Sequence, residues 1–307
     1  MNIANPIYDV VFKYLMDDTR AAKLIISYLT GFDVLDLEFK PTEHRVANVG
    51  ENNFTVCRMD FAAKINTPEG PKVILIEIQK AKFATDIMRF RRYLGSQYSN
   101  PDNCISHIQE INGKTYEQKV ATPIFTIYLL GHELEFGDVP VIRVERSCID
   151  VVNNKVLDGK SEFIESLTHD SVVVQIPAIK GNRRNKLEML LSFFDQDLTV
   201  DSTKHTLYID DEKLPEELKF IHRILAKANS ATEVKETMNI EDEVLAELGD
   251  KERMIALLRE ETEGAVKAKI KAEEEKQKAE VREQKMYELL KSLGHSEDEI
   301  LKKLSQF

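Results

Sequence analysis

The sequence predicts a fold of the α/β class, α+β in detail, with a mixed central sheet flanked by helices and a helical C-terminal extension. Three observations support this prediction. Short runs of alternating or continuous apolar residues, bounded by Gly, Pro and Asn, are typical of strands. Apolar residues at helical spacing lie between these runs and predict helices that cover the sheet. From about Leu214 onward the pattern is almost entirely helical and rich in charge, and we predict a folded domain over 1–200 and a helical extension over 201–307.

The N-terminal residues predict two helices. Asn5 followed by Pro6 is a favourable helix start, because Asn caps free amides and Pro fits the first helical position. Asp9 and Lys13 would then lie one turn apart on the surface of this helix. A second helix is predicted from about Arg20 to Thr30, with Gly31 as its C-cap, and a strand over 34–39 follows.

The next strand places a carboxylate among apolar residues. Alternation over 54–65 predicts one strand whose core face carries Cys57, Met59, Phe61, Ala63 and Ile65. Asp60 falls on the opposite face. From the strand pattern alone, Asp60 is equally well interpreted as a functional carboxylate or as a polar residue at an exposed strand end.

A second carboxylate ends the following strand. Val73–Ile76 is apolar on both faces, which is typical of an interior strand, and Glu77 and Gln79 then share one face. The turn formers of 66–71 predict a hairpin that brings Glu77 near Asp60. Two buried carboxylates are costly without a compensating cation, and a divalent metal is a common solution that also supports chemistry. The alternative is a structural ion pair of Glu77 with Arg58 or Lys80.

A helix is predicted from about Ala84 to Tyr98. Its core residues would be Phe83, Ile87, Phe90 and Leu94, and its opposite side would carry Arg89, Arg92, Tyr93 and Ser96. That side is either a phosphate-binding face or an ordinary solvated face. The later predicted elements are strands over 123–130, 139–152 and 171–176 and a helix over 185–195.

Beyond Leu214 we predict only helices. Gly249 is expected to end one of them. The segment 265–293 contains no Gly or Pro and only a thin apolar stripe, which is typical of a solvated helix or a weak oligomerisation handle. Residues 1 to about 200 are therefore predicted to fold without the extension, and a homo-oligomer would form through the C-terminal helices.

Composition excludes several classes of protein. The sequence contains no run of about 18 consecutive apolar residues, so no membrane span is expected. Residues 1–6 lack the features of a signal peptide. The three cysteines are isolated, which predicts a cytoplasmic location and argues against a zinc site. No nucleotide cofactor is expected.

The charge distribution bears on nucleic-acid binding. The net charge of −11 does not favour phosphate binding, which depends on basic surface. Local clusters matter more than net charge, however. One basic cluster follows the Glu77 strand (Lys80, Lys82, Arg89, Arg91 and Arg92), and a second is Lys180, Arg183, Arg184 and Lys186.

These motifs resemble a known family. An Asp on one strand and Glu-x-Lys on the next form the core of the PD-(D/E)XK nucleases, and here Gln79 stands in the place of the lysine. The chain resembles the transposase-related branch of that superfamily, which includes the recombination-promoting (Rpn) nucleases. The resemblance rests on Tyr8–Lys13, Arg58–Asp60, Ile76–Gln79 and Arg89–Tyr98, and the layout continues to about Asp195.

The resemblance implies a restriction-endonuclease-like fold and metal-dependent hydrolysis of DNA phosphodiester bonds. Asp60, Glu77 and the carbonyl of Ile78 would bind Mg²⁺ or Mn²⁺, since oxygen donors suit these ions. Gln79 would orient the attacking water, and Asp9 would complete the metal pocket. The implied DNA-binding residues are Lys13, Lys80, Arg89 and Arg92.

Two other interpretations fit the same residues. A catalytically inactive relative would bind DNA or a protein partner, and would retain DNA without metal-dependent cutting. A structural oligomer, with its carboxylates in internal salt bridges, would do neither.

Overall fold

The computed structural model describes residues 1–47, 54–80, 82, 84–111, 114–181, 183–294 and 296. The chain forms two units, Met1–Leu245 and Ala246–Phe307. The strands are β1 (Asn2–Ala4), β2 (Asp36–Phe39), β3 (Glu43–Ala47), β4 (Phe54–Arg58), β5 (Phe61–Thr67), β6 (Gly70–Gln79), β7 (Cys104–Ile111), β8 (Lys114–Ala121), β9 (Ile124–Leu130), β10 (Val141–Val144), β11 (Cys148–Asp150), β12 (Lys155–Leu157), β13 (Asp170–Gln175) and β14 (Thr206–Tyr208). The α-helices are α1 (Asp9–Met16), α2 (Thr19–Thr30), α3 (Ala84–Tyr98), α4 (Glu162–Leu167), α5 (Lys186–Leu191), α6 (Glu216–Ser230) and α7 (Thr232–Ser292).

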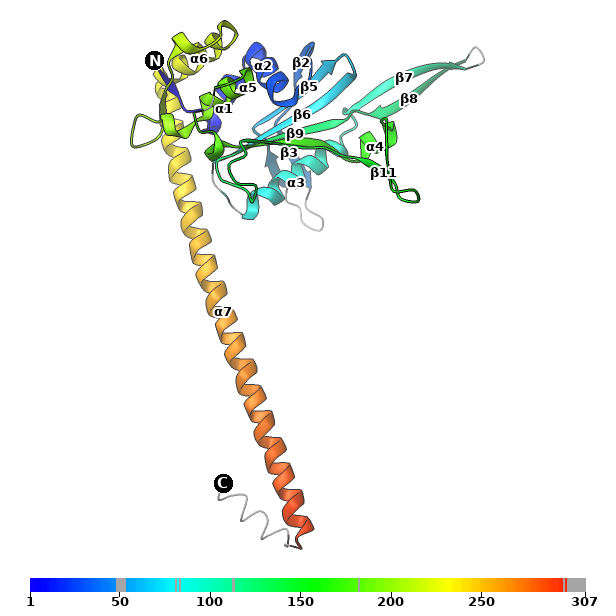
Figure 1. Cartoon of the computed structure of the whole chain (residues 1–307), viewed down its shortest axis with the longest axis vertical. Helices are drawn as coiled ribbons and strands as arrows, with labels where there is room; N and C mark the ends of the chain where they lie inside the picture. The colour runs from blue at the N-terminus through cyan, green and yellow to red at the C-terminus, as the bar shows by residue number, and fades with distance from the viewer. Residues whose placement is uncertain are drawn as a thin grey trace. The chain divides into compact units, whose positions relative to one another are not determined.

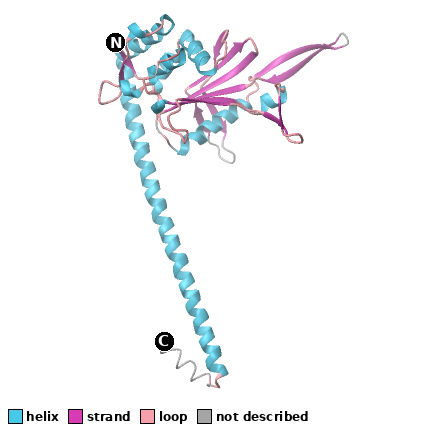
Figure 2. Ribbon diagram, viewed as in Figure 1, coloured by secondary structure: helices cyan, strands magenta, loops and turns pink. Residues whose placement is uncertain are grey.

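A six-stranded mixed sheet forms the centre of the first unit, in the order β10-β13-β9-β6-β5-β2 (Figures 1 and 2). β6 pairs antiparallel with β5 and parallel with β9. Residues 73–78 of β6 are all buried, which confirms the prediction of an interior strand. The predicted α/β class with a helix-flanked mixed sheet is therefore confirmed.

The two faces of the sheet have separate cores. The larger core joins alternate residues of β5 and β6 to buried side chains of α1, α2, α5 and α6. The smaller core lies under α3, where Phe90 and Tyr93 pack against Met59, Val73 and Leu75. Figure 1 shows α3 on the opposite side of the sheet from α2. Residues that alternate along β6 consequently face different helices.

The predicted strand over 54–65 is wrong in one respect. The strand is interrupted at Met59 and Asp60. The part before them, β4, pairs with β3 in a separate hairpin, and the part after them, β5, pairs with β6. Met59 lies in the smaller core with Ala62, whereas Phe61 belongs to the larger core. The alternation continues through this break in the sequence and therefore does not reveal it.

The start of the first helix also differs from the prediction. α1 begins at Asp9, and Asn5 is fully buried in a turn in which its Oδ1 accepts a hydrogen bond from the amide of Ile7 at 3.2 Å. The Nδ2 of Asn5 donates to the carbonyl of Lys204 and to Gln196 Oε1, each at 2.8 Å. Asn5 thus fixes the N-terminus to a distant segment instead of capping α1. The second helix ends as predicted, with Gly31 at a φ of +74°.

The predicted core stripe of α3 is shifted. Phe90 is buried as expected, but Ile87 is 54% exposed, and Tyr93, which was predicted on the polar side, is fully buried. Phe83 lies outside the described residues. The predicted strand over 139–152 is divided into β10 and β11, and β7 with β8 forms a hairpin that the sequence pattern did not predict.

The first unit extends well beyond residue 200. β14 pairs with β1, and α6 contributes Leu218, Ile221 and Leu225 to the larger core with no exposed area. The start of α7 adds Val234 and Met238 to the same core. The division predicted at residue 200 is therefore moved to Leu245, because these segments complete the core.

The second unit consists of the later part of α7 and the residues that follow it. α7 continues through Gly249, which was expected to end a helix. A single Gly costs about 1 kcal/mol in a helix interior, too little to stop a helix whose other residues favour it. No helix in the described part of the chain combines the length and apolar character needed to cross a membrane.

Candidate functional site

Asp60 and Glu77 occupy opposite positions at the open end of the β5–β6 hairpin. Phe61 pairs with Ile76, so Asp60 lies one position beyond the last ladder pair and opposite Glu77. The Asp60 carboxylate accepts a hydrogen bond from the backbone amide of Ile78 at 2.6 Å. Ile78, predicted as a metal ligand through its carbonyl, thus also orients Asp60.

The environment of Asp60 disfavours its charged form. Burial raises the pKa of Asp60 well above its ordinary value, and the nearby charges of Glu77 and Asp9 raise it further. The hydrogen bond from Ile78 and the charge of Lys13 oppose this rise only in part. Glu77 and Asp9 each act on Asp60 as a nearby negative charge, and a cation bound beside Asp60 would relieve this repulsion.

The two carboxylate oxygens of Asp9 have different surroundings. Its Oδ2 forms the expected i,i+4 ion pair with Lys13 at 2.6 Å. Its Oδ1 is buried and has no hydrogen-bond partner among the described residues. A buried carboxylate oxygen without a donor is costly, and a cation beside Asp60 would satisfy it.

A cavity gives access to Asp60 from the α1 side. Its volume is about 370 Å³. Lys13 and Lys40 are among its lining residues and are of the right charge for a phosphate group. The other lining residues are Met16, Asp17, Phe39, Pro41, Thr42, Asp60, Phe61 and Ala62.

Glu77 lies on the α3 side of β6 and is already ion-paired. Its side chain is 1% exposed, and its Oε1 accepts a hydrogen bond from the guanidinium of Arg89 at 2.7 Å. Arg89 was predicted to contact DNA; its side chain is 49% exposed, so one edge still faces solvent. Burial of the Tyr128 phenol raises its pKa to about 12; a hydrogen bond with Thr126 opposes this rise, and the nearby charge of Glu77 adds to it.

We expect the substitution Arg89→Met to lower the free energy of unfolding by about 1–3 kcal/mol, because a buried carboxylate would lose a charged donor. Arg92→Met is the matched control, since Arg92 lies on the same helix with an exposed side chain. Urea denaturation of both variants measures the difference. Equal stabilities would show that the Glu77–Arg89 ion pair contributes nothing to folding.

Gln79 ends β6, where two segments of the backbone pass close to each other. Its side chain is half-buried, and its backbone carbonyl accepts a hydrogen bond from the amide of Gly131 at 2.7 Å. A Cβ on Gly131 would lie 2.4 Å from the carbonyl oxygen of Lys80, so only glycine fits there. Gly131 thereby holds the end of β6, including Gln79 and Lys80, against the chain that follows β9.

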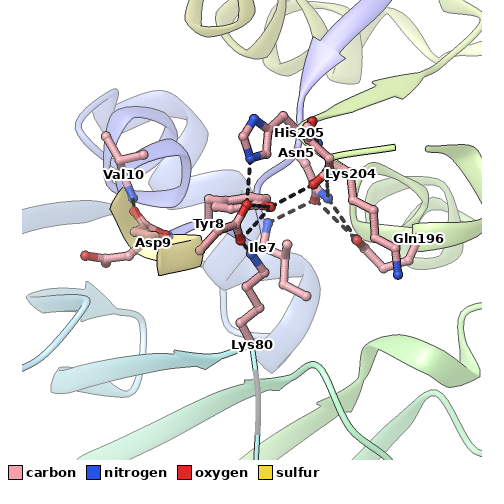
Figure 3. Close-up of polar contacts among 12 residues, drawn as sticks. Asn5, Ile7, Tyr8, Asp9, Val10, Lys80, Gln196, Lys204 and His205 are labelled. Carbon is pink, nitrogen blue, oxygen red and sulfur yellow. Dashed lines mark hydrogen bonds and ion pairs between the residues drawn. The ribbon is translucent and has the colours of Figure 1, made fainter. Parts of the chain in front are cut away.

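Lys80 is the centre of a second polar cluster, which we call the Lys80 cluster (Tyr8, Lys80, His205, Glu241 and Asp242). The ammonium of Lys80 is ion-paired with Asp242 and lies 3.4 Å from the centre of the Tyr8 ring. The Tyr8 hydroxyl lies 3.1 Å from both oxygens of Asp242, and His205 Nε2 lies 2.8 Å from Oδ2. Figure 3 shows Lys80 reaching toward Tyr8 and His205 from below.

The pKa values of the ionisable groups in the Lys80 cluster are shifted in different directions. Burial lowers the pKa of Lys80 below its ordinary value despite the nearby Asp242. Burial raises the pKa of Glu241, although amides of Val10 and Asp9 donate to it. For Asp242, burial acts to raise the pKa, but hydrogen bonds from Lys80 and His205 outweigh it, and the net shift is downward.

No sequence pattern pointed to His205, Glu241 or Asp242 as site residues. His205 approaches Tyr8 because β14 pairs with β1, and Glu241 and Asp242 approach it because the start of α7 packs on the core. No motif or regular spacing links these residues in the sequence.

The alternative prediction for Glu77 was a structural ion pair with Arg58 or Lys80. Glu77 does form an ion pair, but its partner is Arg89. Lys80 pairs with Asp242 instead, and the side chain of Arg58 is outside the described part.

The second predicted basic cluster is largely neutralised by acids that the sequence pattern did not pair with it. Lys180 pairs with Asp138 at 2.5 Å, and Arg184 pairs with Glu188 at 2.7 Å. Lys186 pairs with Glu217 at 2.7 Å. Of the two basic clusters, the one that follows β6 contains Arg89, which contacts Glu77.

Across the described residues, no three His, Cys, Asp or Glu side chains form a ready-made metal site. The oxygen donors at Asp60, the buried Asp9 Oδ1 and the repulsion between carboxylates nevertheless fit Mg²⁺ or Mn²⁺ better than a softer metal. Comparison of the chain with family models, with curated proteins and with solved structures gave no match.

Proposed function

We propose that this protein is a metal-dependent DNA endonuclease of the transposase-related PD-(D/E)XK type. The observation that carries the proposal is the crowding of Asp60 with Glu77 and Asp9 where β5 and β6 meet. Ion pairs account for part of this negative charge, yet Asp9 Oδ1 keeps no partner among the described residues. Carboxylate oxygens at the end of a rigid interior strand are suited to holding a hard divalent cation.

Asp60 and Glu77 would hold Mg²⁺ or Mn²⁺, together with the Ile78 carbonyl and Asp9. Arg89 donates to Glu77 Oε1, and because each carboxylate oxygen has two lone pairs, an oxygen that accepts this bond can still bind an ion. When bound, the ion supplies a water of lowered pKa and neutralises charge that develops on the phosphate. Gln79 would orient the water through its amide, and Lys13, which lines the cavity beside Asp60, would face the phosphate.

A plasmid-nicking assay with the full chain tests the proposal. We expect supercoiled DNA to be nicked with Mg²⁺ or Mn²⁺ and to stay intact with EDTA. The substitution Asp17→Asn is a matched control, because Asp17 lines the same cavity but is exposed. Nicking that persists in EDTA, or that is absent with both metals, contradicts the proposal.

Gln79 replaces a lysine, so its contribution is a separate prediction. We expect Gln79→Ala to reduce nicking about 10-fold or more while Mn²⁺ affinity stays within about twofold, because the amide orients water and does not bind the ion. Isothermal titration with Mn²⁺ measures the affinity. Unchanged nicking in Gln79→Ala would show that another group, such as Lys13, holds the water.

One observation favours a second candidate function. Glu77 is ion-paired with Arg89 and Lys80 with Asp242, so one residue assigned to the metal site and one assigned to DNA binding are already neutralised within the chain. This arrangement fits a non-catalytic module that binds DNA or a protein. Such a module would retain DNA in a gel-shift assay and would show no metal-dependent nicking.

We further propose that α7 mediates self-association, as its exposed apolar side chains predict. Sedimentation velocity of the full chain and of residues 1–245 compares the two states. A full chain that stays monomeric at tens of micromolar contradicts this proposal. The exposed apolar residues of the second unit include Leu248, Ile255, Leu258, Val266, Ile270 and Val281.

A further inference from the structure

Two acids at the start of α7, Glu241 and Asp242, bind groups next to the candidate active site. The carboxylate of Glu241 accepts hydrogen bonds from the backbone amides of Asp9 at 3.0 Å and Val10 at 2.9 Å. These are the first two amides of α1, which has no side-chain cap from its own N-cap residue. Asp242 binds Lys80, the residue that directly follows Gln79.

These two acids occupy donors that a phosphate group also prefers. Free amides at the start of a helix and a lysine ammonium are typical ligands of phosphate oxygens. A carboxylate resembles a phosphate in offering paired anionic oxygens to such donors. In the structure, the negative charge at Lys80 and at the start of α1 thus comes from the chain itself.

The start of α7 contacts this site mainly through polar side chains. Val234 and Met238 are buried, but from Asn239 to Leu245 no residue is buried, so Glu241 and Asp242 carry much of the contact there. The ion pair of Lys80 and Asp242 is partly exposed, with 24% and 39% of the side chains accessible. Such pairs are weak and screened by salt, so a polyanion of high charge density can replace them.

We propose that Glu241 and Asp242 act as an internal competitor of the DNA backbone, so that DNA phosphate must displace them to reach Lys80 and the first turn of α1. This inference rests on the proposed function and adds a means of regulating it. A partner or a modification that draws the start of α7 away from the core would raise DNA affinity. A purely structural role for the two acids predicts the opposite, a loss of stability without any gain in affinity.

The test is fluorescence anisotropy with a labelled DNA duplex, in EDTA so that no cutting occurs. We expect Asp242→Asn to bind about threefold more tightly than wild type and Glu241→Gln/Asp242→Asn about tenfold more tightly. Glu243→Gln is the matched control, because Glu243 is an exposed acid on the same helix and its substitution changes the net charge by the same amount as Asp242→Asn. Adding Lys80→Gln to Asp242→Asn should abolish the gain, because the released ammonium is then missing.

Thermal unfolding of each variant shows whether it remains folded. If the double variant is unfolded, the affinity of Asp242→Asn alone decides the test. An equal gain in Glu243→Gln, or no gain in folded Asp242→Asn, overturns the competitor role. The competitor role is also overturned if neither the wild type nor any variant binds DNA at 50 mM salt. The nuclease proposal fails differently, through DNA binding with the expected gain but without metal-dependent nicking.

Discussion

A chain cut after Thr199 is expected to be unfolded, whereas a chain cut after Leu245 should unfold cooperatively near the melting temperature of the full protein. The shorter fragment lacks β14, the partner of β1, and all of α6. It also loses Leu218, Ile221 and Leu225, which are fully buried in the larger core. Each buried aliphatic side chain contributes about 1.5–3 kcal/mol, and the total stability of a domain is only about 5–15 kcal/mol.

Circular dichroism and limited proteolysis of residues 1–199 and 1–245 test this expectation. A stable, protease-resistant 1–199 fragment with a cooperative melt would restore the boundary predicted from the sequence. It would also show that the buried side chains of α6 add little. The 1–245 fragment retains the Lys80 cluster, so it is the smaller form in which the candidate site is complete.

The second large effect concerns the carboxylates. We expect Asp60→Asn and Glu77→Gln each to reduce metal-dependent nicking by about 100-fold or more, because changes outside a ligand shell already cost 10–100-fold. Arg89→Met should have a smaller effect, since Arg89 would orient Glu77 without binding the ion. Rates from a nicking time course at saturating Mg²⁺ measure the differences. A nicking rate in Asp60→Asn within twofold of wild type would contradict the assignment.

The metal-free stability of Asp60→Asn provides a control for folding. The pKa of Asp60 is raised in the folded state above its ordinary value of 3.8, so the folded protein holds this proton at a pH where the unfolded chain has lost it. The contribution of Asp60 to stability therefore falls as pH rises from 3.8 through the raised pKa. At neutral pH, we expect Asp60→Asn to melt at the same temperature as wild type or higher, measured in EDTA.

Local patterns in the sequence predicted the central parts of the fold. Four aliphatic residues in a row identified β6 as an interior strand, and the turn formers after Ile65 predicted its hairpin with β5. Gly31 marked the end of α2, where a positive φ is required. These features depend on neighbouring residues, so their physical causes can be read from the sequence.

Long-range contacts account for what the sequence did not predict. The start of α1 is capped by Glu241, which is 232 residues from Asp9 in the chain. The break at Asp60 arises where β4 leaves the sheet to pair with β3, although the apolar alternation continues. Tyr93 is buried because α3 packs on Met59 and Leu75 with that side. In each case the deciding partner lies in another element.

The most direct test of the central claim is isothermal titration of the full chain with Mn²⁺ at neutral pH. The proposal that Asp60 and Glu77 hold a catalytic metal predicts saturable binding by wild type and by the control Asp17→Asn. It predicts at least a 10-fold loss of affinity in both Asp60→Asn and Glu77→Gln. Wild type that binds no Mn²⁺, or an Asp60→Asn variant that binds it as tightly as wild type, would contradict the claim.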